Sequence, residues 1–309
     1  MSDTAAGSAE PTPADASPAD ATRAALEDLL DLLDLQRTDD DADTFRGKGS
    51  GFDEFGLYGG HVLAQAVVAA QRTTDRRAGQ ERLLNSVHAV FLRGGDGMAD
   101  VDYTVERVRD GRAFCTRRTQ AHQFDRLIFE LMATFHVPET GRVSIDCPMP
   151  EGVAPPESLP TYQECIAQVG PIFGEQWSYM TRPVEYRLAH APWAPTGPSP
   201  RGGIDYWFRV PRRLPDDPAV HEAVIAYMSD DCLADNVIVP YGVTWLDEGI
   251  HVVSLDHAMW FHAPARADEW IYCEQRPLTA GGNRGTAQAR FWQHGRLVAT
   301  AVQEALARL

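Results

Sequence analysis

Three aspartates that could act as a general base stand close together in the second half of the chain: Asp230, Asp231 and Asp235. Hydrolysis needs a group that takes a proton from an attacking water, and a suitably placed carboxylate can do this. The surrounding residues 218–239 predict a helix that begins at Pro218. Asp230 could equally cap a helix, as aspartates often do. The residues alone therefore nominate a general base without choosing among the three carboxylates.

Other residue patterns are weaker candidates for chemistry. His257 and His262 lie five residues apart on a predicted strand, where side chains alternate between opposite faces, so a shared metal is not expected. His88 and His257 are expected to be core histidines that bond to the backbone. The glycine-rich segment 47–51 lacks the spacing of a phosphate-binding loop. No G-x-S-x-G motif occurs, which argues against an α/β-hydrolase.

The composition excludes several classes of protein. The 309 residues carry a formal net charge of −16, but residues 1–43 hold twelve acidic and two basic side chains, so most of the acidity belongs to this stretch. No run of Lys or Arg exceeds two residues, so a nucleic-acid partner is not expected. Neither a long uncharged apolar stretch nor a signal-peptide pattern occurs, so no membrane partner is predicted. The five cysteines include no C-x-x-C pair, which fits a reducing cytoplasm.

Hydrophobic periodicity divides the chain into an acidic tail and two similar halves. Residues 1–22 are predicted to be disordered, and an amphipathic helix is predicted over 24–35. Residues 55–71 contain no charged side chain and predict a buried helix. Residues 148–220 contain 14 of the 21 prolines and predict a linker with a few ordered pieces. Strands are predicted at 85–92, 100–109, 113–121 and 127–137, and in the second half at 204–210, 251–261, 268–276, 284–293 and 296–306.

The two halves can be aligned with each other. Residues 86–93 match 255–262 at an offset of 169, whereas the helices and the last strands match at 170. The helix alignment places Asp230 opposite Gly60, at the start of a buried helix, where free N–H groups would hold a carboxylate as the anion. A repeat of this length predicts a duplicated α+β domain, each copy with one long central helix wrapped by an antiparallel sheet.

Several blocks of the sequence, in one order and spacing, are similar to a single family of enzymes. The blocks are Gly59–Ala66, Ser86–Arg93 with Arg109–Phe114, and Ser254–His262 with Val302–Glu304. In these blocks, and from about Leu26 to the C-terminus, the chain resembles the acyl-CoA thioesterase II family. The resemblance implies a double hotdog fold, with two tandem hotdog domains. It also implies hydrolysis of the thioester between coenzyme A and an acyl chain, without a metal or a further cofactor.

The resemblance also implies which side chains hold the attacking water. In the family an Asp, a Thr or Ser, and a Gln share this role. The Asp of a Tyr-x-Ser-Asp stretch corresponds to Asp230, the hydroxyl to Ser254, and the amide before a Glu in the last strand to Gln303. Asp230 is thereby preferred over its two neighbours as general base. Many relatives have Thr at the position of Ser254, and the first helix commonly opens Gly-Gly-Gln where this chain has His61.

The repeat adds a prediction about the number of sites. The first-half counterparts of Asp230, Ser254 and Gln303 are, in this alignment, Gly60, Asn85 and Ala133. Because the base and the amide are both missing there, we expect one active site per chain, in the second half.

These inferences together predict a cytoplasmic acyl-CoA thioesterase of fatty acid metabolism, with acyl-CoA as substrate and a possible homo-oligomeric state. The predicted divisions are a tail over 1–22, an N-terminal hotdog domain over 23–147, a proline-rich linker over 148–182 and a C-terminal hotdog domain over 183–309. Two alternatives share the fold. A non-catalytic acyl-CoA binding protein would not need the three residues, and a hydratase or dehydratase needs a His with a carboxylate, a pair that the sequence does not place.

Overall fold

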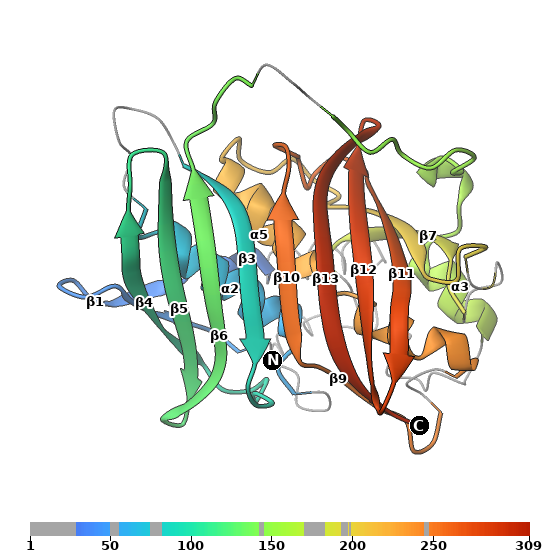
Figure 1. The fold of residues 1–309 in the computed structure, drawn as a ribbon, viewed down its shortest axis with the longest axis horizontal. Helices are drawn as coiled ribbons and strands as arrows, with labels where there is room; N and C mark the ends of the chain where they lie inside the picture. The colour runs from blue at the N-terminus through green and yellow to red at the C-terminus, as the bar shows by residue number, and fades with distance from the viewer. Residues whose placement is uncertain are drawn as a thin grey trace, which may run out of the picture.

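The computed structural model describes most of the two predicted halves (Figure 1). The described residues are 29–49, 56–74, 82–141, 145–169, 183–192, 197, 199–243 and 247–309. The predicted disordered tail lies outside the described residues, as do the first part of the predicted helix over 24–35 and residues 170–182 of the predicted linker. The end of that helix is described, and residues 29–33 are helical.

The described strands form one antiparallel sheet that runs through both halves. Its order is β1-β2-β4-β5-β6-β3-β10-β13-β12-β11-β8-β7, and β9 pairs with β13 beside this path. The first-half strands are β1 (Gln36–Asp39), β2 (Thr44–Gly47), β3 (Leu83–Phe91), β4 (Val101–Asp110), β5 (Phe114–Gln123) and β6 (Arg126–His136). The second-half strands are β7 (Glu185–His190), β8 (Asp205–Arg209), β9 (His251–Ser254), β10 (Asp256–Phe261), β11 (Ile271–Gly281), β12 (Arg284–Gln293) and β13 (Arg296–Arg308). The predicted strand over 251–261 is two strands, because the chain changes course at Leu255.

The two halves meet where β3 pairs with β10, so the segments that match in sequence lie next to each other (Figure 1). The offset of 169 predicted for these segments is wrong by one residue. Ala89 pairs with Leu131 in the first half and Met259 pairs with Ala301 in the second, so the true offset is 170 here as elsewhere. Since side chains alternate along a strand, a slip of one residue exchanges the buried and exposed faces. His257 therefore corresponds to buried Val87, whereas His88 is exposed and corresponds to Ala258.

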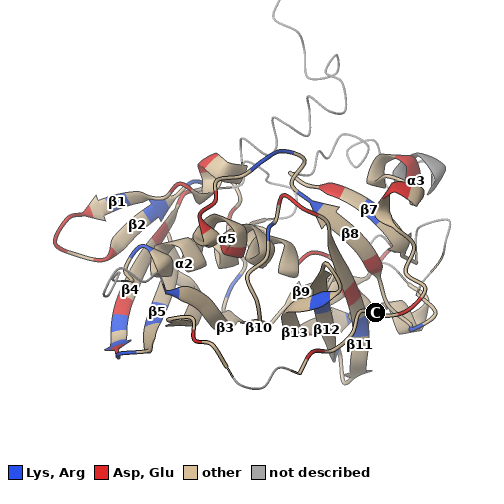
Figure 2. Ribbon diagram, turned by 90° about the horizontal axis from the view of Figure 1, so that it is seen from above, with Lys and Arg blue, Asp and Glu red and all other residues tan. Residues whose placement is uncertain are grey.

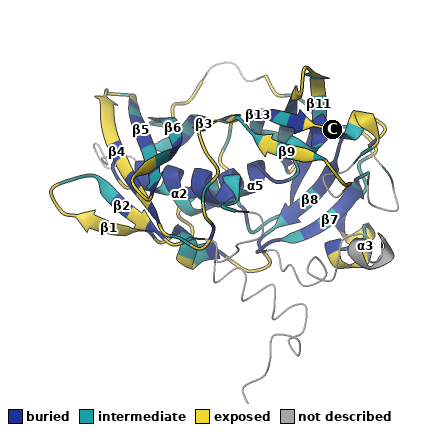
Figure 3. Cartoon of the chain, turned by 90° about the horizontal axis from the view of Figure 1, so that it is seen from below, coloured by how far each residue is buried: buried dark blue, intermediate teal, exposed yellow. Residues whose placement is uncertain are grey.

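Two helices pack side by side against one face of this sheet (Figure 3). They are α2 (Gly59–Gln71), which confirms the predicted buried helix, and α5 (Pro218–Ser229). The start of α2 meets the end of α5, since a Cβ atom at Gly60 would lie 2.2 Å from the backbone oxygen of Tyr227. At the other end Gln71 Nε2 donates to Glu222 Oε2 at 2.9 Å, so the helices are antiparallel. Figure 2 shows that α2 carries no Lys, Arg, Asp or Glu, as expected for a helix without a polar face.

The predicted helix over 218–239 is correct only as far as Ser229. Beyond Asp230 the chain forms a turn and two short 3-10 helices, η4 (Ala234–Val237) and η5 (Val239–Tyr241). Cys232 has a φ of 59°, which an α-helix cannot accommodate. Here side-chain amides, and not helical backbone N–H groups, donate to the backbone carbonyls. Asn236 Nδ2 donates to the Cys232 oxygen at 2.8 Å, and Gln275 Nε2 donates to the Asp231 oxygen at 2.6 Å. The second half therefore has its α-helix, α5, just before the segment that matches α2, and that segment, residues 229–241, contains η4 and η5.

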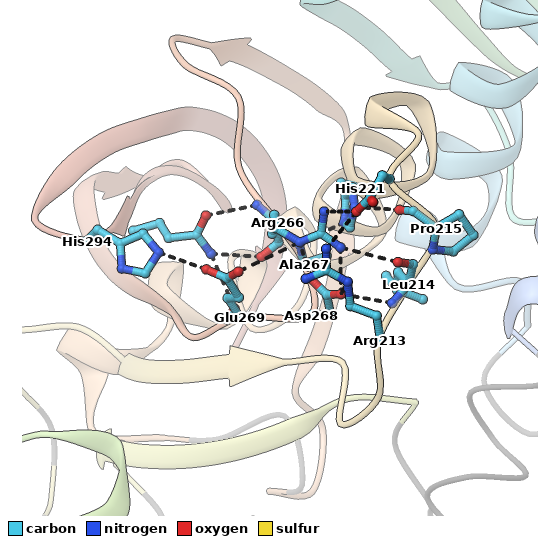
Figure 4. Close-up of polar contacts among 11 residues, drawn as sticks. Arg213, Leu214, Pro215, His221, Arg266, Ala267, Asp268, Glu269 and His294 are labelled. Carbon is cyan, nitrogen blue, oxygen red and sulfur yellow. Dashed lines mark hydrogen bonds and ion pairs between the residues drawn. The ribbon is translucent and has the colours of Figure 1, made fainter.

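The start of α5 is held by a polar cluster (Figure 4). The Asp217 side chain caps the helix by accepting from the Ala219 N–H at 3.0 Å, and Pro218 occupies the first turn. His221 Nε2 lies 2.9 Å from the Pro215 oxygen, and its Nδ1 accepts from the Ala267 N–H at 3.1 Å. Asp268 accepts from the Leu214 N–H and from Arg266, both at 2.8 Å. These bonds fix α5 at one end and so position Asp230 at the other.

The described part of the proline-rich segment contains ordered elements, as predicted. They are η2 (Pro156–Ser158) and α3 (Tyr162–Val169). Two indole N–H groups of the second-half sheet hold the beginning of this segment, because Trp207 donates to the Ala154 oxygen and Trp292 donates to the oxygen of Cys147, the residue just before the segment, both at 3.0 Å. Among the helices described, none has the length and apolar character needed to cross a membrane.

Candidate active site

Asp230 lies directly after the last residue of α5 and is buried, with 8% of its surface exposed. The expectation that it stands at the start of its own buried helix is wrong, because it forms the C-cap of α5. The helix start that it faces belongs to α2 in the first half. A Cβ atom at Gly59 would lie 2.7 Å from Asp230 Oδ2, and the adjacent Gly60 N–H favours the ionised carboxylate and lowers its pKa.

This contact gives α2 the cap that its own sequence lacks. Tyr58 occupies the N-cap position of α2 without a side-chain hydrogen bond, and no acidic residue stands in the first turn. A carboxylate that accepts from an N–H of the first turn satisfies an otherwise free donor and interacts favourably with the positive end of the helix dipole. The expected stabilisation of the Asp230 anion by a helix start is therefore supplied by the other half.

Gln303 and Ser254 meet at the same place. Gln303 is fully buried in β13, and its Nε2 donates to Ser254 Oγ, at the end of β9, at 2.5 Å. The Gln303 amide also faces the Asp230 carboxyl group and lowers its pKa. The structure thus brings together the three side chains predicted from the resemblance, with the Gln303 amide between the carboxyl group and the hydroxyl.

His257 is the fourth buried member of the cluster. It is 1% exposed, its Nδ1 lies 2.7 Å from Gln303 Oε1, and its Nε2 lies 2.9 Å from Ser229 Oγ. The prediction that His257 is buried is confirmed, but its partners are side chains and not the backbone. The same prediction for His88 is wrong, because that side chain is exposed and its ring stacks edge-on against Trp260 at 5.3 Å.

Burial dominates the electrostatics of the cluster. It raises the pKa of the Asp230 carboxyl group, and this effect outweighs the lowering by His257, by the Gln303 amide and by the Gly60 N–H. Burial likewise lowers the pKa of His257, although the nearby Asp230 opposes this. A raised pKa makes Asp230 a stronger base than an exposed aspartate, and a lowered pKa keeps the imidazole neutral.

One oxygen of Asp230 remains available. Asp230 Oδ1 is buried and accepts no hydrogen bond within the described part of the chain. Leaving a buried acceptor without a donor costs about 1–3 kcal/mol, so such atoms are rare in folded proteins. A catalytic role is one reason why a protein retains such an atom. The neighbouring Asp231 is engaged differently, because its Oδ2 accepts from the Tyr186 hydroxyl. This contact distinguishes Asp230 from its neighbour on structural grounds.

A histidine and a carboxylate share this cluster, which the sequence did not predict. The alignment of the two halves could not indicate it, because the offset of 169 placed His257 opposite His88 and so concealed that only His257 points inward. The arrangement does not favour a hydratase or dehydratase, since both ring nitrogens of His257 are occupied by Gln303 and Ser229. The ring is therefore committed to partners within the protein.

The fold and the cluster define a double hotdog protein, and comparison with solved structures supports this. A conserved protein with hot dog fold from Alicyclobacillus acidocaldarius matches with a TM-score of 0.69 at 19% identity, covering 91% of this chain and 98% of that chain. An acyl-CoA thioesterase II, TesB2 from Mycobacterium marinum, matches with a TM-score of 0.71 at 34% identity, covering 92% and 97% of the two chains.

Sequence comparison extends the match to the family. The model of the acyl-CoA thioesterase family matches residues 198–306, and that of the acyl-CoA thioesterase N-terminal domain matches residues 50–136. Human acyl-coenzyme A thioesterase 8 is 32% identical over 289 residues, covering 90% of this chain and 88% of the human protein. The chain belongs to the acyl-CoA thioesterase family, whose members are thioester hydrolases.

Proposed function

We propose that this chain hydrolyses acyl-CoA to a free fatty acid and coenzyme A by direct attack of a water held by Asp230, Ser254 and Gln303. The observation that carries this proposal is the Gln303 amide, which joins the Ser254 hydroxyl to the Asp230 carboxyl group while Asp230 Oδ1 remains without a donor. A water that donates to Oδ1 would have one proton directed at the base and a lone pair free for attack.

The reaction follows from this arrangement. The water oxygen bonds to the thioester carbonyl carbon, its proton passes to Asp230, and the carbonyl electrons move to the oxygen. The tetrahedral intermediate then collapses, the carbon–sulfur bond breaks, and the departing thiolate of coenzyme A takes the proton back from Asp230, which regenerates the carboxylate. Burial that raises the pKa of Asp230 favours the first proton transfer, because it brings the affinity of the base for a proton closer to that needed near neutral pH.

The start of α2 supports this role by holding the carboxylate in place. Its Gly60 N–H faces Asp230 and leaves Oδ1 as the acceptor without a donor within the described part of the chain. Because Gly59 lacks a side chain, the carboxylate can approach the start of the helix closely. We also propose the cytoplasm as the location of the protein, on the cysteine pattern, and a homo-oligomer remains a prediction.

The test is Asp230→Asn, measured by release of free thiol from palmitoyl-, octanoyl- and acetyl-CoA. The amide keeps the size of the side chain and removes the base, so we expect kcat to fall by at least about a hundredfold, the scale of a positioned acid–base group. Asp231→Asn is the matched control, because an amide oxygen can still accept from Tyr186, and its kcat should stay near the unmodified value. A near-normal rate in Asp230→Asn would refute the proposal.

A further inference from the structure

We propose that His257 is a positioning residue that sets the orientation of the Gln303 side-chain amide. The inference rests on the proposed function, since it concerns how one of the three water-holding residues is presented. Gln303 has two chemically different ends at its amide group, and only one orientation suits the cluster. His257 is the side chain that contacts the Gln303 oxygen, at 2.7 Å from its Nδ1.

The hydrogen-bond roles follow from one another, starting at the base. An ionised Asp230 can only accept, so the Gln303 atom that faces it must be the nitrogen. The same nitrogen donates its second hydrogen to Ser254 Oγ. Gln303 Oε1 must then face His257, and the imidazole has to present Nδ1 in its protonated form. In the neutral ring Nε2 then carries no proton, so the single hydrogen of the Ser229 hydroxyl is shared between Nε2, at 2.9 Å, and the Ala226 oxygen, at 2.8 Å.

The reverse orientation of the amide would disable the site. It would turn Oε1 toward the Asp230 carboxylate and toward Ser254, and it would place the two amide hydrogens against His257. Two acceptors would then face each other in a buried environment, where their repulsion is weakly screened. A protonated Nδ1 therefore favours the productive orientation and disfavours the other one.

The ring is held firmly enough to act in this way. His257 is 1% exposed, and Ser229, which contacts its second nitrogen, directly precedes Asp230 in the chain. The imidazole thus connects the end of α5, which carries the base, to β13, which carries the amide. Its counterpart in the first half is Val87, which has no polar atom to offer, and the counterpart of Gln303 is Ala133. The histidine and the glutamine thus occur together in the half with the cluster and are both missing from the other half.

Two amides of different length separate this role from simple packing. An Asn side chain can place its N–H₂ group close to the position of Nδ1, whereas a Gln side chain reaches the position of Nε2. His257→Asn can therefore still donate to Gln303 Oε1, and His257→Gln can bond to Ser229 but leaves Gln303 without its donor. We expect His257→Gln to lower kcat by roughly a hundredfold, the scale of a misplaced catalytic group, with KM little changed. His257→Asn should keep kcat within about tenfold of the unmodified enzyme, which is the difference expected when one neutral hydrogen bond near the site is lost.

A double-mutant cycle with Gln303→Ala completes the test. If His257 acts through Gln303, then adding His257→Gln to Gln303→Ala should lower kcat by no more than about threefold further, because the two residues form one unit. Equal losses in the Asn and Gln variants, or a full loss added in the Gln303→Ala background, would overturn the inference. Full activity in both Gln303→Ala and Asp230→Asn would instead overturn the proposed function, and the inference with it.

Discussion

The Asp230 carboxyl group faces the backbone N–H of Gly60, which lowers the carboxyl pKa, although these two residues occupy equivalent positions in the two halves of the chain. Equivalent residues come together where two repeated units meet about an approximate two-fold axis. In the described structure that meeting point lies beside the β3–β10 pair and the crossing of α2 and α5. One half thus contributes a helix start that has no cap of its own, and the other contributes the carboxylate that caps it.

The close approach at Gly60 predicts that Gly60→Ala damages both stability and activity. A Cβ atom there would lie 2.2 Å from the Tyr227 oxygen and 2.6 Å from the ring of Tyr58, so the backbones of the two helices would have to separate. Overpacking of this kind costs about 1–3 kcal/mol of unfolding free energy. Urea unfolding measures the loss, and kcat should fall because α2 and Asp230 move apart.

Gly94→Ala is the matched control for this substitution. A Cβ atom at Gly94 would meet nothing within 4 Å, and the residue is exposed. We expect its unfolding free energy and its kcat to stay close to those of the unmodified chain. Equal unfolding curves for the two variants would contradict the interpretation that α2 and α5 can pack closely only if residue 60 has no side chain.

Much of the architecture could be predicted because it depends on local pattern. The absence of charged residues in α2 and the alternation of residues along β5, β6, β12 and β13 are properties of short segments, and the structure has these elements where they were expected. The end of α5 could not be predicted in this way. It depends on Gln275 in β11 and Asn236 in η4, whose side-chain amides donate to the backbone carbonyls of Asp231 and Cys232.

The residues of the cluster also divide into those that could be predicted from the sequence and those that could not. Asp230, Ser254 and Gln303 were named from the resemblance, and they meet in space. His257 was misinterpreted because letter matching favoured an offset of 169, whereas strand pairing follows 170. An alternation rule cannot correct such a slip by itself, since it needs the register of the neighbouring strand. The helix start that faces Asp230 was assigned to the wrong half for a related reason, because sequence does not show which helix end a loop approaches.

Acid should destabilise the protein through His61. This ring is 2% exposed, its Nε2 lies 3.0 Å from the Lys48 oxygen, and burial lowers its pKa from 6.5 to about 4. The unfolded chain then binds more protons between these two values. The stability that the neutral ring contributes is present above pH 6.5 and is lost as the pH falls toward 4, by up to about 3 kcal/mol.

His61→Gln tests this pH dependence, because glutamine is polar, can donate to the same carbonyl and does not titrate. Urea unfolding of the variant between pH 7 and pH 4.5 should show a clearly shallower loss of free energy than the unmodified chain. His88→Gln removes an exposed imidazole and serves as the control, so its pH dependence should follow that of the unmodified chain. The same slope in all three proteins would show that His61 is not the residue responsible.

The number of active sites provides the last prediction, which is one site per chain. Strand pairing places Leu84 opposite Phe135 and Ser254 opposite Ala305, so the first-half counterpart of Ser254 is Leu84 and not Asn85. With Gly60 and Ala133 at the other two positions, none of the three first-half counterparts offers a side-chain carboxylate, hydroxyl or amide to hold a water.

Calorimetric titration with an unreactive acyl-CoA analogue should therefore give one equivalent bound per chain. Kinetics give an independent answer, because a second competent site would leave about half of the thiol release in Asp230→Asn, whereas a single site leaves about 1% or less. A stoichiometry of two, together with half-retained activity, would show that the first half hydrolyses thioesters with residues other than these.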